Sequence, residues 1–85
     1  MKTFNYVIQD EIGIHARPAG GLAKLVKTFN STVMVSVGDK SAKAKSAMAV
    51  MGLGALKGTE VTFTIEGDDE EAACEAISKY MAENV

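Results

Sequence analysis

The sequence predicts a two-layer α/β (α+β) sandwich, in which helices cover one face of a four-stranded, mainly antiparallel sheet. Four short segments alternate between apolar and polar residues, as half-buried strands do, and three segments repeat apolar residues at helical spacing. Their order along the chain is β-α-β-β-α-β-α. The length of 85 residues, 47% of them hydrophobic, predicts one domain over residues 1–85.

The first strand and the first helix are separated by a polar turn. Residues 3–9 alternate in polarity, and a polar stretch up to Gly13 ends that strand. The apolar side chains that follow recur at helical spacing, which predicts an amphipathic helix with Lys24 and Lys27 on its outer face. The apolar side of this helix consists of Ala16, Ala19, Leu22, Ala23, Val26 and Phe29.

The middle of the chain predicts a hairpin followed by a short helix. Residues 33–37 alternate as a second strand, and Gly38-Asp39 is typical of a two-residue connection to a third strand at residues 40–44. Ser46 then precedes the apolar residues 47–51, which glycines close. We expect a short helix there with Ser46 as its N-cap.

The last part of the chain predicts a fourth strand and a third helix. Residues 61–65 alternate in polarity, and the acidic residues after them are typical of a helix start. Asp68 and Glu71 have the spacing of a capping box. Cys74 adjoins the apolar stripe of this helix, so we expect a small core residue rather than a reactive thiol. The stripe consists of Ala73, Ala76, Ile77 and Tyr80.

The composition excludes several classes of protein. No apolar run approaches the roughly 20 residues that span a bilayer, and the first residues show no signal-peptide pattern. The single Cys74 excludes an internal disulfide and is typical of a reducing compartment, so we expect a cytoplasmic protein. One histidine and one cysteine cannot form a zinc site by themselves, and we expect neither a metal nor another cofactor.

The net charge of −2 conceals a segregation of charge along the chain. Residues 13–58 contain seven basic residues and one acidic residue, whereas the two ends together contain two lysines and ten acidic residues. A fold that keeps these segments apart would steer an anionic partner toward the basic face. A solvated surface with chance clustering is the simpler alternative. Nucleic acid is disfavoured as a partner, because no aromatic residues interleave the basic positions.

The segment His15-Ala16-Arg17-Pro18 contains the only histidine and the only proline. A neutral imidazole is nucleophilic near neutral pH, and a guanidinium suits phosphate oxygens. Pro18 favours a helix start, with either His15 or Arg17 as N-cap. In both cases the positive helix end favours an added anion and disfavours a protonated ring. The segment predicts a phosphoryl carrier, since no nucleotide-binding glycine loop accompanies it; a capping or surface histidine is the alternative.

Two motifs carry a resemblance to a known family. Residues 13–19, Gly-Ile-His-Ala-Arg-Pro-Ala, resemble the phosphorylation-site signature of the HPr family, the histidine-containing phosphocarriers of the bacterial phosphoenolpyruvate:sugar phosphotransferase system. Residues 45–54, Lys-Ser-Ala-Met-Ala-Val-Met-Gly-Leu-Gly, are similar to the regulatory serine segment of its Gram-positive members. Length, element order and motif spacing also agree, and two motifs at matched spacing are more specific than either alone.

The resemblance implies an open-faced β-sandwich and a carrier with no enzymatic turnover of its own. His15 would accept a phosphoryl group on Nδ1 from enzyme I and pass it to the enzyme IIA domains of sugar transporters, with Arg17 binding the phosphoryl oxygens. In Gram-positive relatives the serine that matches Ser46 is phosphorylated by an ATP-dependent HPr kinase/phosphorylase, which creates a surface for a catabolite-control transcription regulator. A plain N-cap is the alternative role of Ser46.

The resemblance also implies a docking surface beside the histidine, where flexible methionines suit several partners. Ala47 stands where regulated relatives carry a larger aliphatic residue, which weakens the expectation of docking to the kinase or the regulator. Gly20-Gly21 stands where larger residues are usual, and our hypothesis is that Gly20 permits close approach of partner proteins. The implied docking surface consists of Ala16, Gly20, Lys24, Lys27, Ala47, Met48 and Met51.

Other functions stay open from the sequence. A carrier in a nitrogen-linked or dihydroxyacetone-linked phosphotransfer chain is compatible with the same residues. A small-ligand-binding regulatory α/β domain, with His15 as a helix cap, would bind a metabolite and carry no acid-labile phosphate. A relative switched only by its serine would lack the histidine, so His15 argues against it. We expect a monomer, because one face must be presented to many partners.

Overall fold

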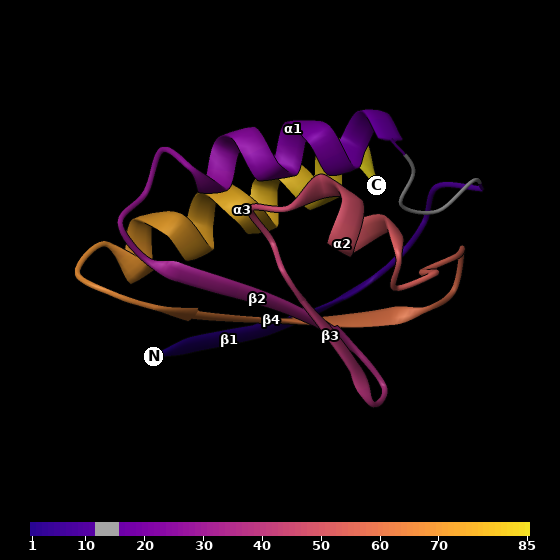
Figure 1. Ribbon diagram of the computed structural model, residues 1–85, viewed down its shortest axis with the longest axis horizontal. Coiled ribbons are helices and arrows are strands. Elements are labelled where there is room, and N and C mark those ends of the chain that lie inside the picture. Colours follow the sequence, from indigo (N-terminus) through magenta and orange to yellow (C-terminus); the bar gives the residue numbers. More distant parts are fainter. Residues whose placement is uncertain (12–15) are drawn as a thin grey trace.

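The computed structural model describes residues 1–11 and 16–85 of the chain. In this part of the chain four strands form one antiparallel sheet in the order β1-β4-β2-β3, and three helices lie on the same face of it (Figure 1). This is the two-layer sandwich that the sequence predicts. The strands are β1 (Lys2–Val7), β2 (Thr32–Val37), β3 (Lys40–Lys43) and β4 (Glu60–Glu66), and the helices are α1 (Ala16–Val26), α2 (Ala47–Met51) and α3 (Glu70–Asn84).

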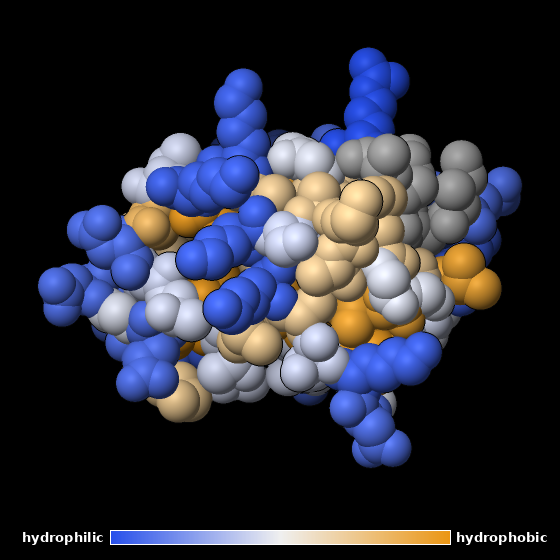
Figure 2. All heavy atoms as spheres, in the orientation of Figure 1, coloured by the Kyte–Doolittle hydropathy of each residue, from blue (hydrophilic) through white to orange (hydrophobic). Residues whose placement is uncertain are grey.

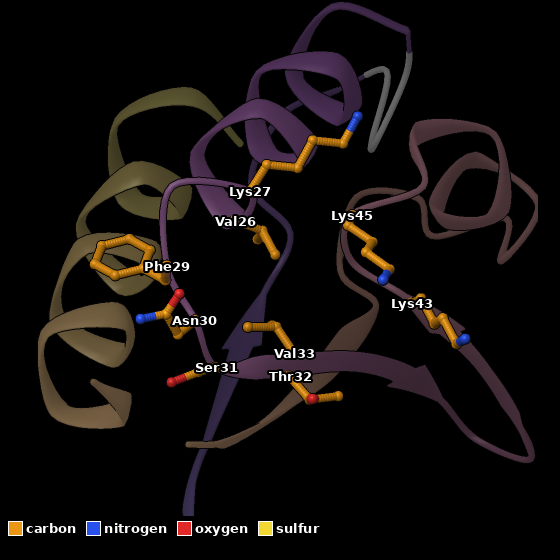
Figure 3. Close-up of a pocket in the computed structure, with 9 residues that line it drawn as sticks. All are labelled: Val26, Lys27, Phe29, Asn30, Ser31, Thr32, Val33, Lys43 and Lys45. Atoms are coloured by element: carbon orange, nitrogen blue, oxygen red, sulfur yellow. The ribbon is translucent and has the colours of Figure 1, made fainter. Parts of the chain in front are cut away.

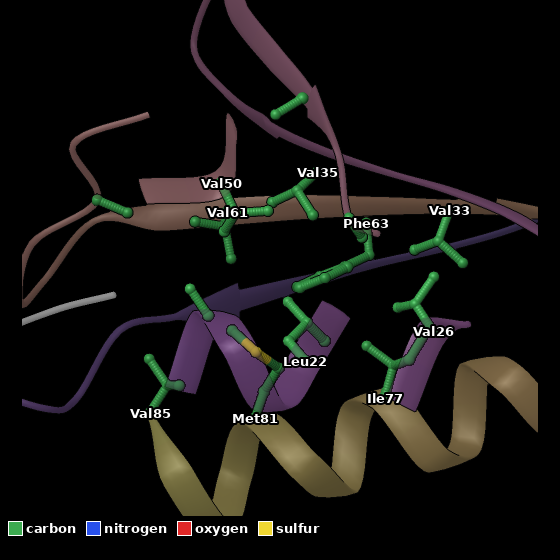
Figure 4. Packing of buried hydrophobic residues seen from close by; sticks show 14 of the residues in the cluster. Leu22, Val26, Val33, Val35, Val50, Val61, Phe63, Ile77, Met81 and Val85 are labelled. Carbon is green, nitrogen blue, oxygen red and sulfur yellow. The ribbon is translucent and has the colours of Figure 1, made fainter. Parts of the chain in front are cut away.

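The core lies between the sheet and the helices, because alternate strand residues point toward the helices (Figure 4). Phe63, in the middle of β4, is fully buried and pairs with Phe4 of β1 and Val35 of β2. Its ring stacks on that of Phe4 with the centroids 4.8 Å apart. Burial of one such side chain contributes about 1.5–3 kcal/mol. The helices contribute Ala19, Leu22 and Val26 from α1 and Ala73, Ile77 and Met81 from α3.

α1 is shorter than its apolar periodicity predicts. The helix ends at Val26, and Phe29, which continues the apolar spacing, is half-buried against the core from the following turn. The backbone N–H of Phe29 donates to the carbonyl of Val26 at 3.1 Å, which is the tighter spacing common at helix ends. At its other end the helix begins at Ala16, so Arg17 lies inside it and is not the N-cap. His15 lies outside the described residues.

The predicted capping box at the start of α3 is wrong. The N-cap is Asp69, one residue later than Asp68, and the spacing to Glu71 is therefore not that of a capping box. The Asp69 carboxylate accepts instead from the loop after α1. Its oxygens accept the N–H of Asn30 at 2.8 Å, the N–H of Ser31 at 3.0 Å and the Ser31 hydroxyl. A tertiary contact across 39 residues thus replaces the expected local one.

The apolar stripe of α3 is longer than predicted. Ile77 is buried as expected and Tyr80 is half-buried, and the stripe continues through Met81. Cys74 is half-buried and packs against the core, as predicted. The hairpin at residues 38–39 and the helix at residues 47–51 also occur as predicted. Among residues 1–11 and 16–85, no helix is both long and apolar enough to cross a membrane.

Candidate functional site

The candidate nucleophile His15 lies outside the described residues, but the helix that follows it is described. α1 begins directly after it at Ala16, and Arg17 is an exposed residue of the first turn. Backbone N–H groups at the start of a helix have no intrahelical partner and form the positive end of its dipole. The first turn of α1 therefore offers an anion both backbone donors and a guanidinium.

A pocket of about 420 Å³ lies beside Arg17. Three segments that are far apart in the sequence meet around it: the turn after β1, the first turn of α1 and the end of α3. Arg17 is exposed and lines this space together with the acidic Asp10. The lining residues are Asp10, Arg17, Pro18, Tyr80 and Asn84.

The end of α3 holds the backbone on both sides of the candidate nucleophile. After it in the sequence, the Tyr80 hydroxyl donates to the carbonyl of Pro18 at 2.8 Å. Before it, the backbone N–H groups of Gln9 and Asp10 donate to the carbonyl of Val85 at 2.8 and 2.6 Å. The sequence predicts Tyr80 only as part of an apolar stripe. No local pattern indicates a hydrogen bond to Pro18, since the two residues are 62 positions apart.

Tyr80 fits against α1 because residue 21 is glycine. A Cβ atom on Gly21 would overlap the Tyr80 hydroxyl oxygen and lie 3.1 Å from the ring carbon that bears it. Burial raises the pKa of Tyr80 above its usual value of 10.0, so the hydroxyl remains a protonated donor at neutral pH. Gly20 differs, because nothing lies within 4 Å of the place where its Cβ would be. A larger residue would therefore collide with Tyr80 at position 21 but would meet open space at position 20.

Ser46 is the N-cap of α2, as predicted. Its side-chain oxygen accepts the N–H of Ala49 at 3.3 Å. The helix has five residues and buries only Val50 among them. Met48 is 81% exposed and Met51 is 36% exposed. These two methionines lie about one turn apart, so both are accessible beside the serine.

The predicted docking surface draws on two helices that pack against each other, α1 and α2. Figure 2 shows an apolar area in the right half of this face, next to the grey atoms, with hydrophilic side chains along its border. Ala16 is the first residue of α1, and Ala47 is half-buried at the start of α2. Among the members whose exposure is described, the exposed ones are Gly20, Lys24, Lys27, Met48 and Met51.

A second pocket of about 420 Å³ lies between the end of α1 and β3 (Figure 3). Figure 3 shows that the ammonium groups of Lys27 and Lys43 point to different sides. These two charges therefore do not converge on one point. The lining residues are Val26, Lys27, Phe29, Asn30, Ser31, Thr32, Val33, Lys43 and Lys45.

Comparison with known proteins assigns the chain to a family. Residues 2–83 match the family model described as the PTS HPr component phosphorylation site. The phosphocarrier protein HPr of Lysinibacillus sphaericus is 40% identical over 83 residues, which are 98% of this chain and 94% of that protein. The chain belongs to the HPr family. The open-faced sandwich that the resemblance implies is confirmed by solved HPr structures.

Two solved structures illustrate the likeness within the HPr family. The histidine-containing phosphocarrier protein of a Mycoplasma has a TM-score of 0.93 and 36% identity, covering 96% of this chain and 93% of that one. The Bacillus subtilis catabolite repression protein Crh has a TM-score of 0.79 and 35% identity, covering 94% and 92%, and forms a domain-swapped dimer.

Membership of the HPr family fixes the general activity. The chain is a phosphocarrier of the phosphotransferase system rather than an enzyme with independent turnover. The family implies partners of that system such as enzyme I and enzyme IIA.

Proposed function

We propose that His15 is the phosphoryl acceptor of this carrier. Its Nδ1 atom attacks the phosphorus of phospho-enzyme I, the bond from phosphorus to enzyme I breaks, and a new N–P bond forms on His15. In the next step, an exchange of the same kind transfers the phosphoryl group from His15 to an enzyme IIA domain. The observation that supports this role is the exposed Arg17 in the helix turn that directly follows the only histidine. The positive helix end keeps an imidazole neutral and therefore nucleophilic.

The site has the moderate strength that a carrier needs. A group that binds the phosphoryl product too tightly would prevent its onward transfer. An exposed ion pair contributes only about 0–1 kcal/mol, and Arg17 is exposed. Arg17 and the backbone donors of the first turn of α1 therefore stabilise the phosphoryl group without trapping it.

Phosphorylation of the intact protein tests the role of His15. The protein is incubated with phosphoenolpyruvate and a bacterial enzyme I, and its mass is measured with and without brief acid treatment. We expect one phosphoryl group that acid removes and that His15→Ala lacks. Failure with several enzymes I would favour a ligand-binding regulatory domain with His15 as a helix cap. Charging only by a donor of a nitrogen-linked or dihydroxyacetone-linked chain would place the carrier there.

We infer that partners dock on α1 and α2 beside this site. The docking surface comprises exposed apolar side chains, Met48 and Met51, next to the lysines of α1. Methionine adapts to partners of different shape. The open space at Gly20 supports close approach of a partner backbone. The proposed set is Ala16, Gly20, Lys24, Lys27, Ala47, Met48 and Met51.

We propose that Ser46 is a regulatory phosphorylation site for an ATP-dependent HPr kinase/phosphorylase. A phosphate here adds about −1.5 to −2 charge at a helix start, which the dipole tolerates. It would thus alter the docking surface without unfolding α2, weaken docking to enzyme I and favour a catabolite-control transcription regulator. The likeness to Crh supports this role. With ATP and such a kinase, we expect an acid-stable phosphate that His15→Ala retains and Ser46→Ala lacks.

We propose that residues 1–85 act as one monomeric domain in the cytoplasm. The cytoplasmic location follows from the phosphotransferase partners that the family implies. The domain-swapped dimer of Crh is the contrasting case. Light scattering across a range of protein concentrations distinguishes the two, since a monomer keeps one mass at every concentration.

A further inference from the structure

A hydrogen bond joins the last turns of α3 to the turn of α1 that carries Arg17. The Tyr80 hydroxyl donates to the carbonyl of Pro18 at 2.8 Å, across 62 positions of sequence. Pro18 directly follows Arg17, and both line the same pocket as Tyr80. A change in the hydrogen bond of Tyr80 therefore affects Pro18, which is next to Arg17.

Gly21 admits this hydrogen bond. Any side chain at position 21 would overlap the Tyr80 hydroxyl, because the Cβ atom alone already does so. Glycine lowers the stability of a helix interior relative to alanine, yet the close approach requires it here. Gly21 and Tyr80 thus form a matched pair that brings a hydroxyl to the start of α1.

The hydroxyl suits a role in holding the helix start. It is neutral, so it adds no further negative charge to a pocket that already contains Asp10. It is protonated and able to donate at neutral pH, and burial raises its pKa further. The first turn that it holds presents the backbone N–H groups that lack intrahelical partners. Their direction relative to a bound anion depends on where this turn is fixed.

We propose that Tyr80 is a positioning residue for phosphoryl transfer: through Pro18 it fixes the first turn of α1, and with it Arg17 and the backbone N–H groups of that turn. Tyr80 has this role only if His15 is the acceptor, as proposed above. It acts through the helix start and not on the reacting atoms.

Titration of His15 tests the positioning role without any phosphoryl donor. The chain has one histidine, so the imidazole signals in an NMR titration belong to it alone. Tyr80→Phe keeps the ring above Gly21 and removes only the hydroxyl. A less firmly held helix start changes the surroundings of the residue that precedes it, so we expect the His15 titration curve of Tyr80→Phe to differ from that of the wild type. The matched control is Tyr6→Phe, the same change at the only other tyrosine, and we expect it to leave the titration unchanged.

The two adjacent glycines provide a second, independent pair of variants. Gly21→Ala displaces the Tyr80 hydroxyl, so it should shift the His15 titration in the same direction as Tyr80→Phe. Gly20→Ala adds the same methyl group into open space and should leave the titration unchanged. Because both active variants break one contact, the double variant Gly21→Ala/Tyr80→Phe should shift the titration no further than either single variant.

Kinetics with phospho-enzyme I complete the test. Tyr80→Phe should lower the maximal transfer rate about two- to tenfold, the range for loss of one hydrogen bond, with KM unchanged because Tyr80 lies outside the docking surface. A wild-type titration and rate in Tyr80→Phe and Gly21→Ala, with only lower stability, would overturn the positioning role. An unphosphorylated wild-type protein would instead overturn the role of His15, and the titration would still report whether Tyr80 controls its surroundings.

Discussion

The two ends of α3 differ in their hydrogen bonds: one end contacts the first turn of α1 and the other contacts the loop that follows α1. The two helices run side by side in opposite directions (Figure 1). At the end remote from the histidine, the Asp69 carboxylate accepts hydrogen bonds from Asn30 and Ser31. At the end beside the histidine, one neutral hydroxyl, that of Tyr80, donates to Pro18. We call these two contacts the Asp69 clamp and the Tyr80 contact.

The two contacts differ in charge and in strength, which indicates that they have different roles. Hydrogen bonds to an ionised group are roughly twice as strong as neutral ones, so the Asp69 clamp is the stronger fastening. It also needs a close approach, since Gly67 has a φ of +157° and a Cβ there would lie 2.6 Å from the Cα of Ser31. The Tyr80 contact is weaker but brings no charge to the pocket beside Arg17. We therefore expect the Asp69 clamp mainly to stabilise the fold and the Tyr80 contact mainly to position the first turn of α1.

Removal of the Asp69 clamp should produce the larger loss of stability. Asp69→Ala leaves the N–H groups of Asn30 and Ser31 without their acceptor, so we expect a clear fall in melting temperature, followed by circular dichroism. Tyr80→Phe should lower the free energy of unfolding by only about 0.5–1.5 kcal/mol. Asp69→Ala, measured well below its melting temperature, should keep the wild-type rate of phosphoryl transfer. Equal stability losses, or a slower transfer in Asp69→Ala, would remove the distinction between the two contacts.

The Asp69 clamp should make stability depend on acid pH. The Ser31 hydroxyl, followed by the Asn30 N–H, lowers the pKa of Asp69 below its usual value. A carboxyl whose pKa is lowered by folding stabilises the native state above its ordinary pKa, near 3.9. That stabilisation is lost as the pH falls through the lowered value. Urea unfolding from pH 7 downward should show this loss, and Asp69→Asn should show a smaller decline; an equally steep decline in the variant would contradict the assignment.

Replacing each of the adjacent glycines by alanine should change the free energy of unfolding in opposite directions. Gly20→Ala faces open space, so we expect a gain of about 0.5–1 kcal/mol in the free energy of unfolding. Gly21→Ala should be less stable than wild type, because the Tyr80 ring must move. Urea unfolding measures both. Gly20→Ala should also slow phosphoryl transfer if partners approach closely there; an unchanged transfer rate would return Gly20 to a residue without a role in docking.

Loss of the cap on α2 should have the smallest effect on the fold. Ser46→Ala removes one side-chain acceptor at 3.3 Å from a helix that buries only Val50, so we expect a loss of about 0.5–1 kcal/mol. Ser46→Asp keeps an acceptor and should retain most of that stability, while its charge should slow transfer from phospho-enzyme I. Identical transfer rates for the two variants would contradict a regulatory role for charge at this position.

The sequence predicts those features for which the local pattern and the tertiary fold agree. The alternation at residues 33–37 and 61–65 matches strands whose inner faces form the core, and Ser46 caps its helix with its own side chain. The helix start among the acidic residues is as predicted, but the capping box is wrong, because the Asp69 carboxylate bonds to a loop 39 residues away. The Tyr80 contact was missed for the same reason. Residues far apart in the chain decide these details, and no local spacing encodes them.

The residues of the candidate site also fall into two groups: those that local motifs indicate, and those that only the fold brings together. His15, Arg17 and Ser46 stand out from local motifs, since their chemistry and helix-start positions are visible in a few consecutive residues. Tyr80 and Asn84 line the pocket beside Arg17 only because α3 ends against the start of α1. Gly21 accompanies this contact, but as a glycine inside a helix it is not distinguished in the sequence from its neighbour Gly20.

A complete relay tests the central claim most directly. A small amount of the protein is added to phosphoenolpyruvate, enzyme I and a large excess of an enzyme IIA domain, and phosphorylated enzyme IIA is counted by intact mass. A carrier at His15 predicts many phosphoryl groups on enzyme IIA per molecule of this protein, and none above background with His15→Ala. Transfer that stops at one group per molecule, or that proceeds equally with His15→Ala, would contradict it.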